Sequence, residues 1–106
     1  FSLVGSPYPV TLNQPELTEQ MLPSLQRAAG ADNVVVAPLE TAAEDFAYFA
    51  NEVPGLYFIV GSTPPEQNAA LAPANHSPFF YLDEAALEVG VRSMLHVAVD
   101  FLQTAN

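Results

Sequence analysis

Three places in the sequence carry side chains that could do chemistry, and His76 is the first. It lies between a polar segment and an aromatic run, in the stretch NHSPFFYLDE. A neutral imidazole there could bind zinc or a similar metal ion through one ring nitrogen. The alternative is an ordinary exposed loop histidine, because no second histidine or cysteine stands at ligand spacing from it.

Glu44 and Asp45 form the second place, an adjacent acidic pair at the predicted start of a helix. The helix dipole favours acidic side chains there, which is a purely structural explanation. The functional alternative is a position at the edge of a substrate pocket or beside a metal ligand. The third place is His96, which we expect to form an exposed pair with Asp100 on one helix face.

The sequence contains no complete catalytic set. It has no glycine-rich phosphate loop, no Gly-x-Ser-x-Gly segment and no His-Glu-x-x-His segment. One loop histidine and scattered carboxylates do not supply a nucleophile, a base and an orienting group together. We therefore expect no catalytic residue within these positions alone.

The composition narrows the class of protein. The 106 residues contain two basic and twelve acidic side chains, for a net charge of -10, and half of them are hydrophobic. Nucleic acid and anionic membranes are not expected partners, because both require clustered Lys or Arg. Without cysteine there are no disulfides or thiolate metal sites. No apolar run approaches the roughly 18 residues of a membrane span. The length favours one domain or a piece of one.

Three helices are expected to carry or flank these residues. Apolar positions at helical spacing predict the first over 15–29, with Asn13 as its cap and a kink or break at Pro23. The second covers 41–51, with Thr41 or a neighbour as cap. Asp83 caps a long final helix, whose buried side we expect to be formed by Leu87, Val91, Met94, Leu95, Ala98, Phe101 and Leu102.

β-Branched and aromatic runs predict strands between the helices. Residues 33–37 and 56–60 are the clearest, and the second run is apolar on both faces, which predicts a buried, central strand. Residues 1–4, 8–12 and 78–82 are expected to be extended, and 61–77 to form a long loop of the kind that often carries function. The alternation predicts an α/β fold with helices packed on a sheet.

Three segments taken together resemble the C-terminal part of a metal-dependent amidohydrolase. They are YPVTLN (8–13), EDFAYF (44–49) and HSPFFYLDE (76–84), in that order. The family is that of hippurate hydrolase, N-acyl-L-amino acid amidohydrolase and the auxin-conjugate hydrolases, within the aminoacylase and zinc-carboxypeptidase clan. Ala42 departs from its pattern, at a position where the family usually has glycine.

The resemblance implies a three-layer α/β catalytic domain, of which this chain holds the C-terminal portion. It places residues 1–12 at the end of a smaller lid domain, which often mediates dimerisation, and residues 13–106 in the catalytic domain. Family members are about four times as long as this chain, which fits two domains. The intact enzyme is then expected to be a homo-oligomer that hydrolyses small N-acyl amino acids.

The resemblance also implies roles for the candidate residues. The family binds two divalent metal ions, zinc or manganese, and His76 matches the ligand that comes from this part of the sequence. Glu44 and Asp45 match a segment near the active-site cleft, as substrate-pocket or supporting residues. The other ligands and the general base belong to segments that this chain does not contain. The isolated chain is therefore expected to be inactive and to hold no metal tightly.

One alternative from another class stays open, a stand-alone acidic α/β interaction module without catalysis. A segment of a larger sheet should instead show open strand edges and an uncovered apolar face. If the chain is a segment of the amidohydrolase, it should therefore contact the remainder of the same enzyme chain or self-associate, rather than exist as a monomer.

Overall fold

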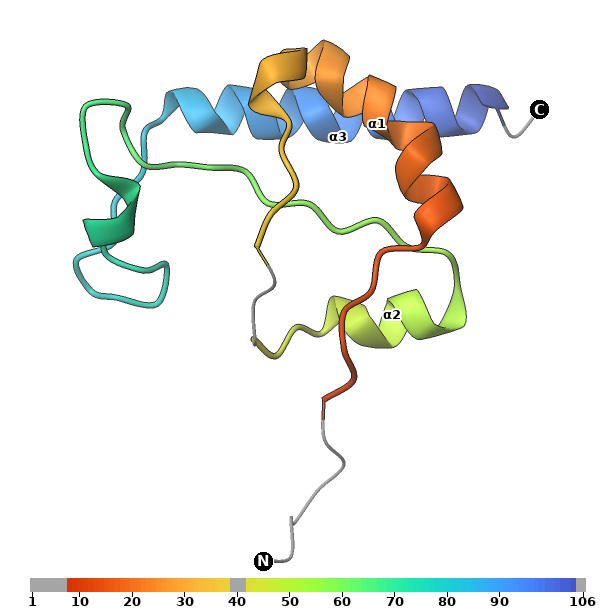
Figure 1. The fold of residues 1–106 in the computed structure, drawn as a ribbon, viewed down its shortest axis with the longest axis horizontal. Helices are drawn as coiled ribbons and strands as arrows, with labels where there is room; N and C mark the ends of the chain where they lie inside the picture. Colours follow the sequence, from red (N-terminus) through yellow and green to blue (C-terminus); the bar gives the residue numbers. More distant parts are fainter. Residues whose placement is uncertain (1–7, 39–41, 105–106) are drawn as a thin grey trace, which may run out of the picture.

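The computed structural model describes residues 8–38 and 42–104, which form three α-helices joined by extended segments (Figure 1). The helices are α1 (Pro15–Ala29), α2 (Phe46–Glu52) and α3 (Ala85–Thr104), with short 3₁₀ turns η1 (Ala31–Asn33) and η2 (Ala69–Leu71). α1 lies along α3, whereas α2 stands apart from both. The radius of gyration is 16.0 Å, against about 13 Å for a compact domain of this size. The arrangement is therefore open.

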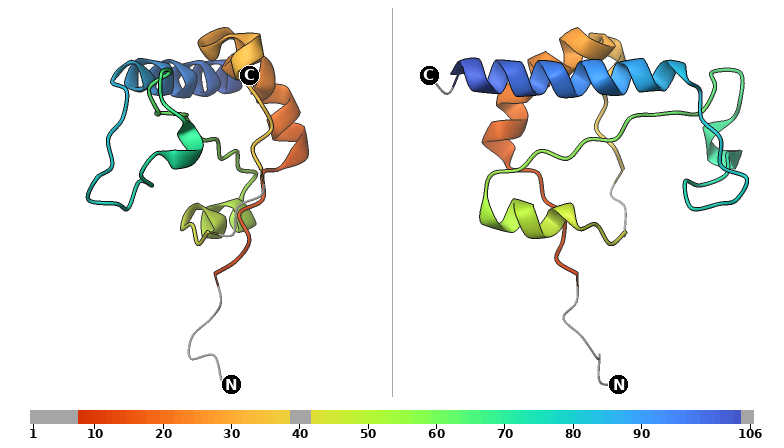
Figure 2. Two further views of the ribbon diagram at one scale, coloured as in Figure 1. Left: turned by 60° about the vertical axis from the view of Figure 1, so that its left-hand side comes forward. Right: turned by 180° about the vertical axis from the view of Figure 1, so that it is seen from behind.

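The residue that caps α1 is Gln14, and not Asn13 as predicted from the sequence. The Gln14 side chain accepts a hydrogen bond from the backbone N–H of Leu17 at 2.5 Å, which satisfies one of the free donors at the helix start. The helix continues through Pro23 without a break, although its axis bends in Figures 1 and 2. Proline lacks the N–H of a helical hydrogen bond, which accounts for the bend. Gly30, with a φ of 90°, ends the helix.

Small side chains let α1 approach α3. Met21, Ser24 and Ala28 form the buried side of α1, and Ser93 is the buried residue of α3. At the far end of the pair, the Gln20 side chain donates to the hydroxyl of Thr104 at 2.7 Å. The core of the described residues is small, because Ala47 of α2 is the only other hydrophobic residue buried in them.

Asp100 ties the two helices together. Its carboxylate accepts a hydrogen bond from the Ser24 hydroxyl at 2.5 Å and forms an ion pair with Arg27. The Ser24 hydrogen bond, followed by the charge of Arg27, lowers the pKa of Asp100 below its usual value. The predicted pair of His96 and Asp100 is found only as a charge effect: His96 also lowers the pKa of Asp100, but no hydrogen bond or ion pair joins the two side chains among the described residues. Asp100 faces α1 instead.

No β-strand forms among the residues that the structure describes. Residues 56–60 run as an extended trace beneath α3 (Figure 1), and their side chains alternate between half-buried and exposed. Residues 34–38 follow η1 without forming a strand, and Val36 is 98% exposed. A strand needs a neighbouring backbone for its hydrogen bonds, and the described residues provide none. The strands predicted at 33–37 and 56–60, and the central burial of 56–60, are therefore wrong for this structure.

The three-layer sheet is likewise not formed by the described residues. Residues 78–82 contain a turn and an irregular segment. The extended segment predicted at 1–4 and the helix cap at Thr41 lie outside the described residues. The α/β class thus stays an expectation that this part of the chain does not confirm.

The two later helices are present, with changed limits or surroundings. The helix predicted over 41–51 begins only at Phe46. The long final helix is confirmed as α3, and the Asp83 carboxylate accepts from the backbone N–H of Ala85 at 2.9 Å, as expected of a residue that starts a helix. Its predicted buried side is wrong, because all seven residues of that stripe are exposed. None of the helices in the described ranges has the length and hydropathy of a membrane span.

Candidate functional site

Glu44 and Asp45 lie immediately before α2, and each carboxylate binds a tyrosine. The Tyr8 hydroxyl donates to Oδ1 of Asp45 at 2.7 Å, and the Tyr57 hydroxyl donates to Oε2 of Glu44 at 3.1 Å. The other oxygen of Glu44 accepts from the backbone N–H of Phe46 at 3.1 Å. Asp45 is the N-cap residue of α2, but its carboxylate makes no capping bond. The acidic pair therefore anchors two tyrosines, and Glu44 also satisfies the first free N–H of α2.

Ring contacts extend this arrangement. The rings of Tyr8 and Tyr48 meet edge to face, with centroids 5.5 Å apart, and those of Phe46 and Tyr57 are tilted at the same separation. Both geometries are favourable for aromatic pairs. The hydrogen bond to Asp45 is also the main cause that raises the pKa of the Tyr8 phenol.

Asn13 joins the same group through the backbone. Its carboxamide donates to the carbonyl oxygen of Tyr57 at 2.8 Å and accepts from the N–H of Tyr57 at 2.7 Å. The next residue, Gln14, donates its N–H to the carbonyl of Gly55 at 3.0 Å. We call the resulting group the tyrosine cluster; its members are Tyr8, Asn13, Glu44, Asp45, Phe46, Tyr48 and Tyr57.

Part of the tyrosine cluster is visible in the sequence. The YPVTLN and EDFAYF segments stand out as motifs, but nothing in them states that they touch. The sequence predicts Tyr57 within a buried strand and Asn13 at a helix start. Only the folded arrangement shows that their polar atoms bind one another.

His76 lies apart from the tyrosine cluster, in an exposed turn. The turn is held by Ser77, whose N–H donates to the carbonyl of Ala74 at 2.8 Å and whose hydroxyl accepts from the N–H of Phe79 at 3.1 Å. The segment that follows η2 lies well away from α2 in Figure 1 and in the right-hand view of Figure 2. The structure thus brings Glu44 and Asp45 together but not His76 with either.

The described residues do not make up a metal centre. No three His, Asp or Glu side chains within residues 8–38 and 42–104 come close enough together to hold an ion. A protein zinc site takes three or four ligands. His76 could therefore supply one ligand at most, to a site completed by residues that these ranges do not contain.

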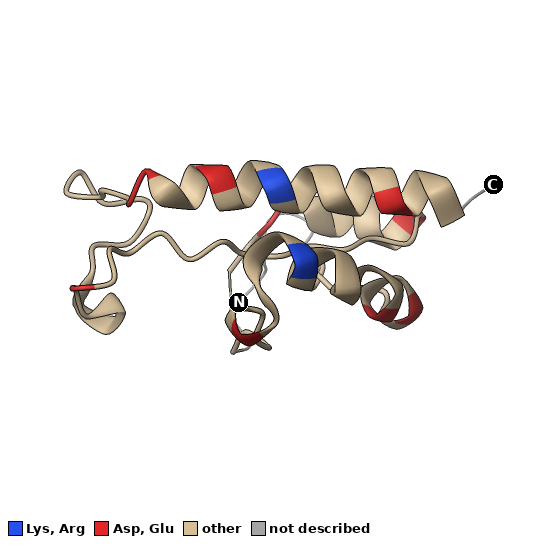
Figure 3. Cartoon of the chain, turned by 90° about the horizontal axis from the view of Figure 1, so that it is seen from above, with Lys and Arg blue, Asp and Glu red and all other residues tan. Residues whose placement is uncertain are grey.

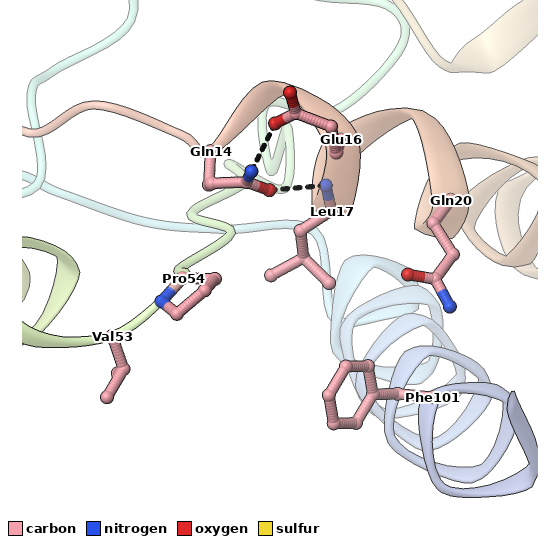
Figure 4. A pocket seen from close by; sticks show the side chains of 7 residues that line it. All are labelled: Gln14, Glu16, Leu17, Gln20, Val53, Pro54 and Phe101. Carbon is pink, nitrogen blue, oxygen red and sulfur yellow. Dashed lines mark hydrogen bonds between the residues drawn. The ribbon is translucent and has the colours of Figure 1, made fainter. Parts of the chain in front are cut away.

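A hollow of about 500 Å³ opens between the start of α1, the end of α2 and the end of α3 (Figure 4). Leu17, Val53, Pro54 and Phe101 give it an apolar wall. Figure 4 shows the carboxamide of Gln14 turned toward Glu16 and the N–H of Leu17, with which it forms hydrogen bonds. None of the predicted site residues lines this hollow, so it is a gap between elements rather than a place for the predicted chemistry.

The positive charges of the chain do not gather on one surface. The two basic residues of the chain lie on different helices, Arg27 on α1 and Arg92 on α3, and acidic residues lie near each of them (Figure 3). Arg27 is engaged by Asp100, and Arg92 lies 3.7 Å from Glu88. A nucleic-acid phosphate would therefore meet isolated, partly neutralised cations.

Known proteins resemble this chain over most of its length. Residues 1–100 match the sequence profile of peptidase family M20/M25/M40. Thermostable carboxypeptidase 2 of Saccharolobus solfataricus is 35% identical over 94 residues, which are 89% of this chain and 23% of that protein. An N-acetyldiaminopimelate deacetylase of Lacticaseibacillus casei is 35% identical over 92 residues, which are 87% of this chain and 22% of the relative.

A plant relative is more distant. IAA-amino acid hydrolase ILR1-like 2 of Arabidopsis thaliana is 29% identical over 97 residues, or 92% of this chain and 21% of that protein. The chain thus spans less than a quarter of the length of these relatives. No solved structure matches it. The family match over residues 1–100 confirms the resemblance of the three motifs: the chain belongs to peptidase family M20/M25/M40.

Proposed function

We propose that the chain is the C-terminal part of the catalytic domain of a metal-dependent amidohydrolase that cleaves N-acyl amino acids. The observation that carries the proposal is the family match over residues 1–100, with the three motifs in order. Two relatives bear names of related activities, a deacetylase of N-acetyldiaminopimelate and a hydrolase of IAA-amino acids. The reaction class is therefore hydrolysis of an amide bond next to an amino acid.

Within that enzyme, residues 1–12 would end the lid and residues 13–106 would belong to the catalytic domain. Enzymes of the family are generally dependent on divalent metal ions, and His76 would supply one ligand. When bound, such an ion polarises the scissile carbonyl and activates water. Glu44 and Asp45 would stand at the wall of the substrate pocket, with Tyr57 and Tyr8 holding their carboxylates in place.

A carboxypeptidase activity is the second candidate. Two thermostable carboxypeptidases of Saccharolobus solfataricus are 35% and 36% identical to the chain. Both candidate activities break an amide bond beside a free amino-acid carboxylate. They differ on the acyl side of that bond, which carries a small acyl group for the amidohydrolase and a peptide for the carboxypeptidase. No comparison supports the stand-alone interaction module.

The test uses the intact enzyme that contains this chain. His76→Ala is compared with His96→Ala, which removes an imidazole from α3 instead. The metal content per protomer is measured by elemental analysis, and rates are measured with hippurate, other N-acyl amino acids and a blocked dipeptide. We expect His76→Ala to bind less metal and to lose at least about 100-fold in rate, since even residues that only support a ligand are worth about 10–100-fold.

His96→Ala should keep both its metal and its rate. Full metal content and an unchanged rate in the His76→Ala enzyme would show that His76 is not a metal ligand. Cleavage of the peptide but of no N-acyl amino acid would select the carboxypeptidase. The isolated 106-residue chain should hydrolyse none of these substrates, and metal-dependent hydrolysis by it would contradict the proposal that the remaining ligands and the base lie elsewhere.

A further inference from the structure

Residues 62–83 form a closed loop, here called the 62–83 loop, which projects from the start of α3 at one end of the molecule (Figure 1). The N–H of Asp83 donates to the carbonyl of Ser62 at 2.7 Å and closes the loop at its neck. Because the Asp83 carboxylate also accepts from the N–H of Ala85, the neck is fixed to the first turn of α3. Within the described ranges η2, which lies inside the loop, contacts no other helix. The position of the loop is therefore set at its neck and by bonds within it.

The loop has two halves, one on each side of His76, and each half is built from local turns. Before His76, the N–H of Gln67 donates to the carbonyl of Pro64 at 2.9 Å. After it, the N–H of Phe80 donates to the carbonyl of Ser77 at 3.0 Å. The loop contains four prolines and no glycine, which restricts its backbone. Each half is therefore stiff, and the placement of His76 depends on how the two halves are held together.

One side-chain contact joins the two halves. The Tyr81 hydroxyl donates a hydrogen bond to Oε1 of Gln67, fourteen positions earlier in the sequence. Besides the neck and the local turn at Ser77, it is the one hydrogen bond between the two halves in the described ranges. A link between distant points of a loop reduces the number of conformations open to the residues between them. His76 is one of those residues, so the link limits where its imidazole can stand.

The imidazole of His76 is available to a ligand. It is exposed, and it forms no hydrogen bond or ion pair with any residue that the structure describes. An imidazole nitrogen suits zinc and similar ions, so His76 fits the role of the single ligand proposed above. A ligand on an unrestrained loop loses conformational freedom when it binds an ion, and this loss lowers the affinity. Bonds that restrain the loop beforehand therefore raise the affinity.

We propose that Gln67 and Tyr81 are positioning residues, whose hydrogen bond braces the 62–83 loop and holds His76 ready to bind a divalent metal ion. The inference rests on the proposed function, since it requires His76 to be a ligand. It adds two residues that act through His76, and Gln67 lies outside all three sequence motifs. The alternative is an exposed hydrogen bond that stabilises only its own surroundings. The two explanations differ in what they predict for metal affinity.

The experiment uses the intact enzyme that contains this chain, freed of metal and titrated with zinc in competition with a chelator. Tyr81→Phe removes only the hydroxyl, and Gln67→Leu removes the acceptor. We expect each variant to bind zinc about 3- to 10-fold more weakly, the range that one lost hydrogen bond between neutral groups produces. The rate of hydrolysis at saturating zinc should stay near that of the unaltered enzyme, because the bound ion then holds the loop in place.

Three further variants separate a brace from a general loss of structure. The double variant Tyr81→Phe/Gln67→Leu should bind zinc no more weakly than either single variant, because both remove the same hydrogen bond. Gln67→Glu keeps an oxygen acceptor and should bind zinc at least as tightly as the unaltered enzyme. Gln20→Leu is the matched control, since Gln20 forms a similar exposed hydrogen bond to Thr104. It should leave zinc binding unchanged.

An unchanged zinc affinity in either Tyr81→Phe or Gln67→Leu would overturn the proposal. Losses that add up in the double variant, a loss in Gln67→Glu, or an equal loss in Gln20→Leu would do the same. His76→Ala is measured alongside to keep the two proposals apart. Weak zinc binding in His76→Ala with normal binding in the brace variants would preserve the ligand role and reject the brace alone. Full zinc binding in His76→Ala would reject both.

Discussion

Asn13 and Tyr57 are joined by both ends of one carboxamide, with Nδ2 2.8 Å from the carbonyl oxygen of Tyr57 and Oδ1 2.7 Å from its nitrogen. The side chain of Asn13 thus stands where a neighbouring strand would present its own peptide group. This contact fastens the segment before α1 to the segment after α2. It does so at the residue whose hydroxyl also holds Glu44.

Asn13→Ala should loosen this junction. Each hydrogen bond contributes roughly 0.5–1.5 kcal/mol net, so losing both should make the amide of Tyr57 exchange about 5- to 150-fold faster. The measurement is residue-resolved hydrogen exchange of the intact enzyme. Asn51→Ala, in α2, is the matched control and should leave Tyr57 unchanged. An unchanged Tyr57 amide in Asn13→Ala would show that the contact carries no stability.

The Tyr8–Asp45 hydrogen bond should appear in a titration of the phenol. The carboxylate of Asp45 raises the pKa of Tyr8 above its ordinary value of 10.0, since it accepts a hydrogen bond from the phenol and opposes a second negative charge. Asp45→Asn should therefore lower that pKa. Tyrosinate absorbance gives the reading, and Tyr8→Phe identifies which of the four tyrosines is responsible.

The sign of the pH effect follows from the raised pKa of Tyr8. The contribution of the contact to folding is complete below pH 10, the ordinary value, and is lost as the pH rises through the folded pKa. Asp32→Asn removes an equal charge from η1 and should leave the Tyr8 pKa in place. A phenol that titrates identically in the unaltered protein and in Asp45→Asn would rule out the contact in solution.

Ser24→Ala should raise the pKa of Asp100. The Ser24 hydroxyl is the main cause that holds this pKa below its usual value of 3.8, ahead of Arg27. A lowered carboxyl pKa stabilises the fold fully above pH 3.8, and that stability is lost as the pH falls through the folded value. The variant should accordingly separate α1 from α3 at a higher pH on acidification.

The readout for Ser24→Ala is the carbon chemical shift of the Asp100 carboxyl during an acid titration. Ser93→Ala is the control, because Ser93 is also a buried serine between the two helices but makes no hydrogen bond to Asp100. An Asp100 pKa that rises equally in both variants would point to loosened packing rather than to the lost hydrogen bond.

Gly55→Ala should strain the tyrosine cluster. A methyl group on Gly55 would lie 3.0 Å from the ring of Phe46 and 3.2 Å from Ala50, which is tighter than normal contact. Displacing a packed ring of this kind costs about 1–3 kcal/mol. Gly61→Ala is the matched control, since nothing lies within 4 Å of a methyl group there. Urea unfolding of the two variants gives the comparison, and equal stability would contradict the packing described for Phe46.

The sequence by itself determined the features that depend on near neighbours. The spacing of apolar residues predicted the α1 and α3 helices, and Asp83 was predicted to cap α3, whereas the predicted cap of α1, Asn13, was wrong. The three ordered motifs indicated the family, because they are local strings that can be compared without a fold. These predictions depend on hydrogen bonds and side-chain spacing within a few turns of chain.

Only the tertiary structure decided which groups meet across long separations. Asp100 could bind His96 on its own helix or Ser24 and Arg27 on another, and packing of α1 on α3 selected the latter. The apolar faces of α3 and of 56–60 predicted burial, which the described residues do not provide. A hydrophobic pattern states that a face needs a partner, whereas the identity of that partner depends on which surfaces the whole chain brings together.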